Sequence, residues 1–264
     1  MPPPRPPLPW RTLADLDFPA LRHLQVLASS RYPTPLPPPP AAPPPSSAVS
    51  LLSFAGQTGP CVLLLRKTGR GRHAAQLCLP GGFADDCDGG DLRRTCLREL
   101  EEETGLGPDG RGQVELLGHG PLNHFWTQKT GIGVACFAGS FDYMDAIYRS
   151  DACCGSAGRD TLGLPVDKNE IDKVLAVPLD MLCSARYARL CEDYHPTAAL
   201  DQEGEEEWSG FTYTGPLFQL GSSVGRQAAD NQRTSPVIWG LTARILAEYL
   251  TLLASVQEEQ GSGG

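Results

Sequence analysis

The chain has 264 residues, a formal net charge of −9 and 41% hydrophobic residues, which fits one globular domain with additions. This acidic balance argues against a protein that binds nucleic acid regardless of sequence, because such a protein needs clustered Lys and Arg to neutralise phosphates. It leaves room for a small phosphate-containing ligand, since a bound divalent cation reverses the local sign of the charge.

The nine cysteines show no C-x-x-C spacing, which gives little support to a zinc site or a redox motif. Their odd number and the lack of a secretory signal favour reduced thiols inside the cell. No run approaches the roughly 20 apolar residues that span a bilayer. We therefore expect an intracellular, soluble protein with no membrane partner, in the cytoplasm in preference to mitochondria.

Residues 1–47 form a proline-rich extension that we expect to be partly disordered. Its segments "MPPPRPPLPW" and "YPTPLPPPPAAPPPSS" are typical of extended, polyproline-like chain without a core. Between them, five leucines from residue 13 to residue 27 recur at near-helical spacing, interrupted by Pro19, and predict one short helix. We interpret the arm as a linker, with weak docking of a partner protein as the alternative.

Residues 48–253 have the texture of a globular domain, and residues 254–264 that of a disordered tail. The runs "AVSLLSF", "CVLLLRK", "AQLCLPGG" and "GIGVACFAGSF" predict strands. "EIDKVLAVPLDMLC" predicts a strand and then a short helix, and "VIWGLTARILAEYLTLLASV" predicts a long amphipathic helix. Three polar segments, residues 148–165, 197–208 and 221–235, interrupt the series as insertions. The mixture of strands and helices predicts a layered α/β fold.

A strongly acidic segment, "DLRRTCLRELEEET", predicts a helix that ends at Gly105 as its C-terminal cap. Each helical residue advances about 100° around the axis, so Glu99, Glu102 and Glu103 share one face. Three converging carboxylates suit Mg²⁺ or Mn²⁺, which prefer oxygen ligands. A solvated acidic surface is the alternative for this pattern taken alone.

The stretch "RELEEETGL", residues 98–106, resembles the R-E-U-x-E-E-x-G-U core of the Nudix box, where U is aliphatic. "PGG" stands upstream, as it does in many Nudix hydrolases. The resemblance implies an α/β/α sandwich with a mixed sheet, in which a loop and this helix hold Mg²⁺ or Mn²⁺ against a diphosphate. At matching positions, Glu99, Glu102 and Glu103 are the implied metal ligands. Arg98 is the implied residue that orients them through an ion pair.

The first half of the box departs from the family pattern G-x5-E-x7-R-E. Five residues separate Gly82 from Asp88, which stands in place of the pattern's Glu, and nine residues instead of seven separate Asp88 from Arg98. The loop is therefore longer and more acidic than the pattern. Four aspartates in it either replace the missing glutamate or are simply solvated: Asp85, Asp86, Asp88 and Asp91.

The segment "LLRKTGRGRHAAQLCLPGG" resembles the additional signature of the coenzyme A diphosphatase branch, approximately L-L-T-x-R-S, a spacer, then H-x-G-Q-x-x-F-P-G-G. Arg66, His73, Gly81 and Gly82 fall on signature positions and are the implied substrate-binding residues. Lys67 is a departure, because the signature has Ser there. "TQKTGIGV", "NEIDKVLAVPL" and "VIWGLTARIL" agree with further segments of the branch in order and spacing.

The resemblance implies hydrolysis of coenzyme A or acyl-CoA, a nucleoside diphosphate type of substrate, to 3′,5′-ADP and (acyl-)4′-phosphopantetheine. A carboxylate must accept a proton from the attacking water, and the candidates are Glu103 and Glu99, then Glu170. Two alternatives stay open. One is the same chemistry on NADH, ADP-ribose or an oxidised nucleotide, and the other is a catalytically weak Nudix-fold binding protein. Some members of the branch act in peroxisomes, which adds a third compartment.

Overall fold

The structure is a computed structural model of the chain, and it describes the following parts. They are residues 9–30, 43–68, 76–108, 112–118, 120–144, 146, 162–196, 211–220 and 236–262. The predicted substrate-binding residue His73 lies outside them, as do residues 1–8 and 31–42 of the proline-rich extension. Most of the three predicted insertions also falls outside the described residues.

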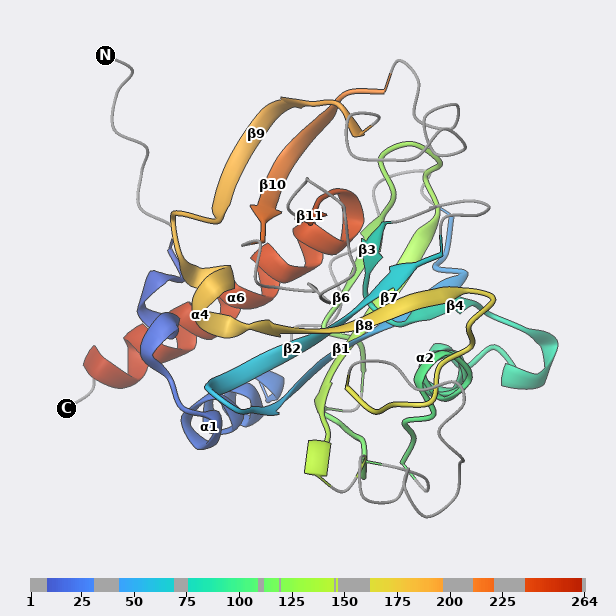
Figure 1. Cartoon of the computed structure of the whole chain (residues 1–264), viewed down its shortest axis with the longest axis horizontal. Coiled ribbons are helices and arrows are strands. Elements are labelled where there is room, and N and C mark those ends of the chain that lie inside the picture. Colours follow the sequence, from blue (N-terminus) through green and yellow to red (C-terminus); the bar gives the residue numbers. More distant parts are fainter. Residues whose placement is uncertain are drawn as a thin grey trace.

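A mixed eight-stranded sheet forms the centre of the described fold (Figure 1). Its strands are β1 (Ser47–Gly56), β2 (Gly59–Lys67), β3 (Leu77–Cys78), β4 (Gly81–Phe83), β5 (Glu115–Leu116), β6 (Asn123–Trp126), β7 (Gly133–Ser140) and β8 (Ile171–Pro178). The order is β3-β2-β1-β7-β5, with β8 paired to β2, β4 to β1 and β6 to β7. β1 and β7 are parallel and the other pairs are antiparallel.

A smaller three-stranded antiparallel sheet lies beside the first, in the order β11-β10-β9. Its strands are β9 (Ala188–Tyr194), β10 (Tyr213–Gln219) and β11 (Val237–Ile238). The long C-terminal helix α6 (Gly240–Ser262) packs against β10. In Figure 1, β9 and β10 rise above the central sheet as the orange pair.

Helices cover both faces of the central sheet because its strands are apolar on both sides. Val62 and Leu64 of β2 belong to a cluster shared with α6 and with the N-terminal helices. Leu63 and Leu65, which alternate with them, belong to a second cluster under α2. The remaining helices are η1 (Arg11–Asp15), α1 (Phe18–Ser29), η2 (Asp86–Asp88), α2 (Leu92–Thr104) and α4 (Leu179–Cys183). The predicted layered α/β fold with a mixed sheet is therefore confirmed.

The N-terminal helix α1 is tied to the C-terminal helix α6. The side-chain amide of Gln25 donates to the hydroxyl of Tyr249 and to that of Ser53, and all three residues are buried. Trp10 adds a hydrogen bond from its indole N–H to the carbonyl of Leu182, at 3.3 Å. The helical segment of the extension, from Trp10 to Ala28, thus contributes to the core of the domain.

Two local expectations differ from the structure. Pro19 was expected to interrupt a helix, but it stands in the first turn of α1, where a missing N–H costs nothing, and Asp17 caps that helix. The tail was expected to be disordered from residue 254, but α6 continues to Ser262 because Val256 still packs into the core. Within the described residues, no helix has both the length and the apolar character needed to span a bilayer.

Candidate active site

The helix α2 carries the predicted glutamates, and local residues fix both of its ends. The side chain of Asp91 caps the N-terminus by accepting a hydrogen bond from the backbone N–H of Arg93. Gly105 ends the helix at φ 67°, and its N–H donates to the carbonyl of Glu101 at 2.8 Å. Leu100 is fully buried against the sheet, so packing fixes which residues of α2 face β4.

Asp88, whose role the sequence left open, is the partner of Arg98. The guanidinium donates from Nε to Oδ1 and from Nη2 to Oδ2, both at 3.0 Å, which is the fork geometry of a strong charged pair. Thr95 and the backbone N–H of Asp85 donate to the same carboxylate. Asp88 is only 3% exposed, and the hydrogen bonds from Arg98 hold its pKa well below the usual range.

The rest of the Arg98 guanidinium holds two of the glutamates. Nη1 donates to Glu99 Oε1 at 2.9 Å and to Glu102 Oε2 at 3.0 Å. Nη2 also donates to the carbonyl of Phe83 at 2.9 Å, which joins the helix to the end of β4. These are the contacts expected of a residue that orients the glutamates, and that role stays a prediction.

Glu103 is the most enclosed of the glutamates and lies between β2 and β4. Its Oε1 accepts a hydrogen bond from Lys67 Nζ at 2.6 Å, and its Oε2 accepts one from the backbone N–H of Gly81 at 2.9 Å. Burial raises the pKa of Glu103, although Lys67 and the Gly81 N–H act in the opposite direction. The structure thus supplies a buried carboxylate that holds a proton more readily than an ordinary glutamate.

Glu99 lies directly against the backbone of Gly82. A Cβ atom at Gly82 would meet the Glu99 carboxylate oxygens at 2.4 and 2.6 Å, so only glycine leaves room for this carboxylate in its present position. Burial raises the pKa of Glu99, and Arg98 opposes the rise. The two predicted glycines therefore contact different glutamates. Gly81 donates its N–H to Glu103, and Gly82, which has no side chain, lets the Glu99 carboxylate pack against its backbone.

Two further predicted residues lie at the edge of this cluster. Glu170 is 3.6 Å from Lys67 Nζ through its Oε2, and its side chain is exposed. Arg66 precedes Lys67 on β2, and successive strand residues point to opposite faces. Arg66 forms a 3.6 Å ion pair with Asp172, the extra residue at a register shift between β2 and β8. The structure therefore brings Glu170 to the glutamates and turns Arg66 away from them.

Lys67 is the functional candidate that the sequence did not single out. It was one member of a basic stretch in which Arg66 and His73 matched a signature. Its position two residues after the buried Leu65 places it on the face of β2 that α2 covers. This alternation was the signal that could have identified it.

The carboxylates have the chemistry of a divalent-cation site but not its geometry. In the described ranges, no three or more His, Cys, Asp or Glu side chains form a group that could hold a metal ion. Arg98 holds Glu99 and Glu102, and Lys67 holds Glu103. Glu99, Glu102 and Glu103 nevertheless present carboxylate oxygens, the ligands that hard divalent cations prefer. In donor type, though not in its present arrangement, the set fits Mg²⁺ or Mn²⁺.

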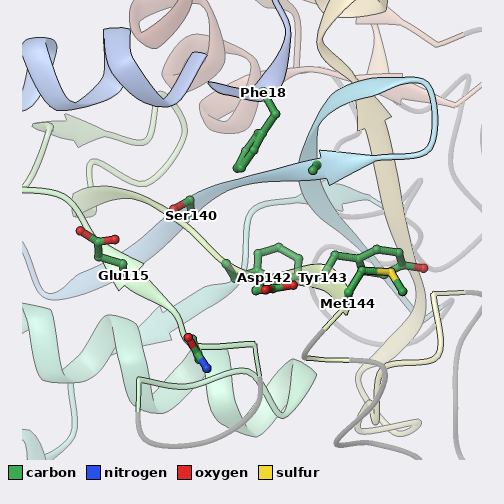
Figure 2. Close-up of a pocket in the computed structure, with 9 residues that line it drawn as sticks. Phe18, Glu115, Ser140, Asp142, Tyr143 and Met144 are labelled. Atoms are coloured by element: carbon green, nitrogen blue, oxygen red, sulfur yellow. The ribbon is translucent and has the colours of Figure 1, made fainter. Parts of the chain in front are cut away.

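A pocket elsewhere in the fold contains none of the predicted site residues. It has a volume of about 320 Å³. Figure 2 shows Phe18 of α1 on one side and Glu115, Asp142 and Tyr143 on the other. The complete lining consists of Phe18, Ala55, Gln113, Glu115, Ser140, Phe141, Asp142, Tyr143 and Met144. The glutamate cluster is thus a separate feature of the molecule.

Comparison with known families identifies the class of protein. Residues 44–200 match the NUDIX domain family, and this range covers more than half of the chain. The chain therefore belongs to the Nudix family. Members of this family typically use divalent metals and bind nucleotide substrates.

Individual relatives resemble the chain over limited stretches. A segment of 45 residues is 44% identical to the peroxisomal coenzyme A diphosphatase ndx-8 of Caenorhabditis elegans, and it makes up 17% of this chain and 19% of that protein. The chain thus matches about a fifth of that relative's length.

Two solved structures resemble the chain more loosely. A C. elegans Ap4A hydrolase binary complex is 15% identical with a TM-score of 0.37, over 51% of this chain and 80% of that one. The NUDIX domain of Shewanella oneidensis NrtR complexed with ADP ribose is 17% identical with a TM-score of 0.34, over 57% and 82%. Likenesses of this size carry no argument about substrates. The expectation that the chain binds no nucleic acid stays a prediction.

Proposed function

We propose that the chain is a metal-dependent diphosphatase that hydrolyses coenzyme A or acyl-CoA to 3′,5′-ADP and (acyl-)4′-phosphopantetheine. The observation that carries the proposal is the contact of two carboxylates, the buried Glu103 and the half-buried Glu99, with the "PGG" loop. Glu103 accepts the Gly81 N–H, and Glu99 fills the space left by Gly82. The helix and the loop of the Nudix box are thereby joined at the position where a diphosphate would be held.

Glu99, Glu102 and Glu103 would hold Mg²⁺ or Mn²⁺, with Arg98 orienting the first two. When bound, such a cation would supply positive charge near the diphosphate and would make a water more acidic. The water oxygen forms the new bond to phosphorus while the bridging P–O bond breaks, and the bridging oxygen leaves with the electron pair. A carboxylate of the chain accepts the water's proton. Glu103 and Glu99 are the first candidates, because both carboxylates contact the "PGG" loop against which a diphosphate would be held.

Glu170 is the second candidate for the base, because it lies beside Lys67 at the edge of the cluster. Arg66, His73 and the two loop glycines are the proposed substrate-binding residues, on the strength of the signature positions that they occupy. The 45-residue likeness to a coenzyme A diphosphatase supports the choice of substrate. Location in the cytoplasm, mitochondria or peroxisomes, and a partner for the proline-rich arm, stay open proposals.

One observation favours a second candidate function. Lys67 occupies the position where the coenzyme A signature has Ser, and its ammonium donates a hydrogen bond to Glu103. A different side chain at this position favours another nucleoside diphosphate compound, such as NADH, ADP-ribose or an oxidised nucleotide. The same ion pair also motivates the reading of a catalytically weak binding protein.

The test is incubation of the purified chain with Mg²⁺ or Mn²⁺ and each of five compounds, followed by mass analysis of the products. The panel consists of coenzyme A, acetyl-CoA, NADH, ADP-ribose and an oxidised nucleoside triphosphate. Release of 4′-phosphopantetheine from coenzyme A supports the first proposal. Faster turnover of NADH, ADP-ribose or the oxidised nucleotide supports the second. Binding without turnover of any compound would overturn both enzymatic proposals.

Two variants on the same helix make the test specific. Glu103→Gln removes the buried carboxylate, and we expect turnover to fall by about 10²–10⁴-fold, the usual contribution of a general base. Glu101→Gln changes an exposed residue on α2, and we expect turnover within about two-fold of the wild type. Equal activity of both variants would remove Glu103 from the proposed site.

A further inference from the structure

Lys67 is directed at the glutamate cluster by the strand that carries it. β2 alternates regularly, and Lys67 follows Leu65 on the face that packs under α2. Its side chain is 23% exposed, so its aliphatic stem is largely covered while the ammonium reaches the carboxylates. The register shift between β2 and β8 falls at this residue and brings Glu170 to the same ammonium.

The contact between Lys67 and Glu103 is short and enclosed. Nζ lies 2.6 Å from Oε1, and the Glu103 side chain is only 4% exposed. Because the Gly81 N–H takes the other oxygen, both oxygens of this buried carboxylate have partners before any metal arrives. A divalent cation that used Glu103 as a ligand would have to displace the ammonium of Lys67 or share the carboxylate with it.

The net negative charge of the cluster is large enough to be offset by one divalent cation. Five carboxylates, those of Asp88, Glu99, Glu102, Glu103 and Glu170, contact two cationic side chains, Arg98 and Lys67. This leaves three negative charges, which one divalent cation reduces to one. With serine at position 67, four negative charges would remain, and two divalent cations would neutralise them.

We propose that Lys67 is a built-in cation of the site, which takes the place of one divalent ion at Glu103. The wild-type chain then binds fewer divalent ions, and binds them more weakly, than the same chain with a neutral residue at position 67. This inference rests on the proposed function, since it takes the glutamates to be the metal site. It adds that the chain itself supplies part of the positive charge.

The test is a titration of the full chain with Mn²⁺, in which free Mn²⁺ is measured by electron paramagnetic resonance. Lys67→Met keeps the length of the stem and removes the charge, and Lys67→Ser introduces the residue of the signature. For both variants we expect Mn²⁺ affinity to rise by about ten-fold or more, or one additional ion to bind. An unchanged affinity and number of ions in both would overturn the proposal.

Three further variants separate charge from structural damage. Lys67→Arg keeps a cation and should show no gain, and Lys168→Met removes an exposed lysine two residues from Glu170 and should match the wild type. Adding Glu103→Gln to Lys67→Met should abolish the gain, because the released carboxylate is gone. A gain in Lys168→Met, or one that survives Glu103→Gln, would show a general charge effect and overturn the assignment to Lys67.

A second readout does not depend on binding stoichiometry. Removing Lys67 leaves a buried carboxylate without its cation, which destabilises the fold. We expect the metal-free Lys67→Met chain to melt at a lower temperature than the wild type and to gain more from Mn²⁺. Neither measurement needs turnover. The Lys67 assignment can therefore fail while the diphosphatase proposal stands, and the reverse also holds.

Discussion

Alanine substitution at two neighbouring glycines should affect different properties of the molecule. A Cβ at Gly81 would lie 2.2 Å from the Ala48 carbonyl oxygen and 2.7 Å from Val49 Cα, and both are backbone atoms of the central strand β1. Gly81 also has φ +147°, which L-residues rarely adopt. Strain of about 1–3 kcal/mol and overpacking of about 1–3 kcal/mol together predict a loss of about 2–6 kcal/mol.

At Gly82 the new Cβ would meet a flexible side chain instead of backbone. Its three nearest atoms belong to the Glu99 carboxyl group, at 2.4 to 2.6 Å. Restoring an ordinary contact of about 3.5 Å displaces that group by about 1 Å. Such a displacement at a reacting centre can cost about 10²-fold in rate, whereas the free energy of unfolding should change by less than about 1 kcal/mol.

The assay is thermal unfolding together with turnover of the best diphosphate substrate. For Gly81→Ala we expect a fall in Tm of about 4 °C or more, at about 2–4 °C per kcal/mol for a chain of this size. For Gly82→Ala we expect a nearly unchanged Tm and the 10²-fold loss of activity. Gly120→Ala is the control, because its Cβ meets nothing within 4 Å. Full activity in Gly82→Ala, or equal melting of the two variants, would refute the reasoning.

Three other predictions concern the same layers of the fold. Leu100→Ala, at a fully buried position on the sheet-facing side of α2, should cost about 2–5 kcal/mol in denaturant unfolding. Asp88→Asn should lower the Tm at pH 7, because the ion pair with Arg98 is lost. Since Arg98 depresses the pKa of Asp88, the difference in Tm between variant and wild type should persist above about pH 4 and shrink as the pH falls further. At pH 8, iodoacetamide should label the exposed Cys87 well before Cys61, whose pKa burial raises to about 11, as measured by peptide mass mapping.

The elements that depend on neighbouring residues could be predicted from the sequence. α2 follows from its period of 3.6 residues and from Gly105, whose φ of 67° needs glycine. The same period places Glu99 and Glu103 toward β4, because both lie on one side of the buried Leu100. Patterns of this kind are local, so they survive whatever the rest of the chain does.

The conformation of the acidic loop before α2, which brings Asp88 to Arg98, could not be predicted from residue spacing alone. Counting residues made Asp88 doubtful, because nine residues instead of seven separate it from Arg98. In the structure Gly89 and Gly90 adopt φ of 63° and 78°, which turns the chain sharply and returns Asp88 beneath the guanidinium. A pattern with fixed spacing cannot represent such a turn, since it depends on backbone conformation rather than on length.

The contact between Lys67 and Glu103 could not be predicted from the sequence for a different reason. This contact joins residues 36 apart in sequence, so it depends on how β2 lies under α2. The periodicity of β2 could give the face of the strand but not the residue opposite it. Only the tertiary arrangement distinguishes this lysine from a solvated one.

The tie between α1 and α6 has a consequence for how the chain is made. Gln25 and Tyr249 are 224 residues apart, and Trp10 meets Leu182 across 172 residues. Contacts of such long range close late, since the loop between the partners must be ordered first. During synthesis the apolar face of α1 must wait for most of the chain to leave the ribosome. We therefore expect folding of the newly made protein to be slow and assisted by chaperones that shield apolar helices.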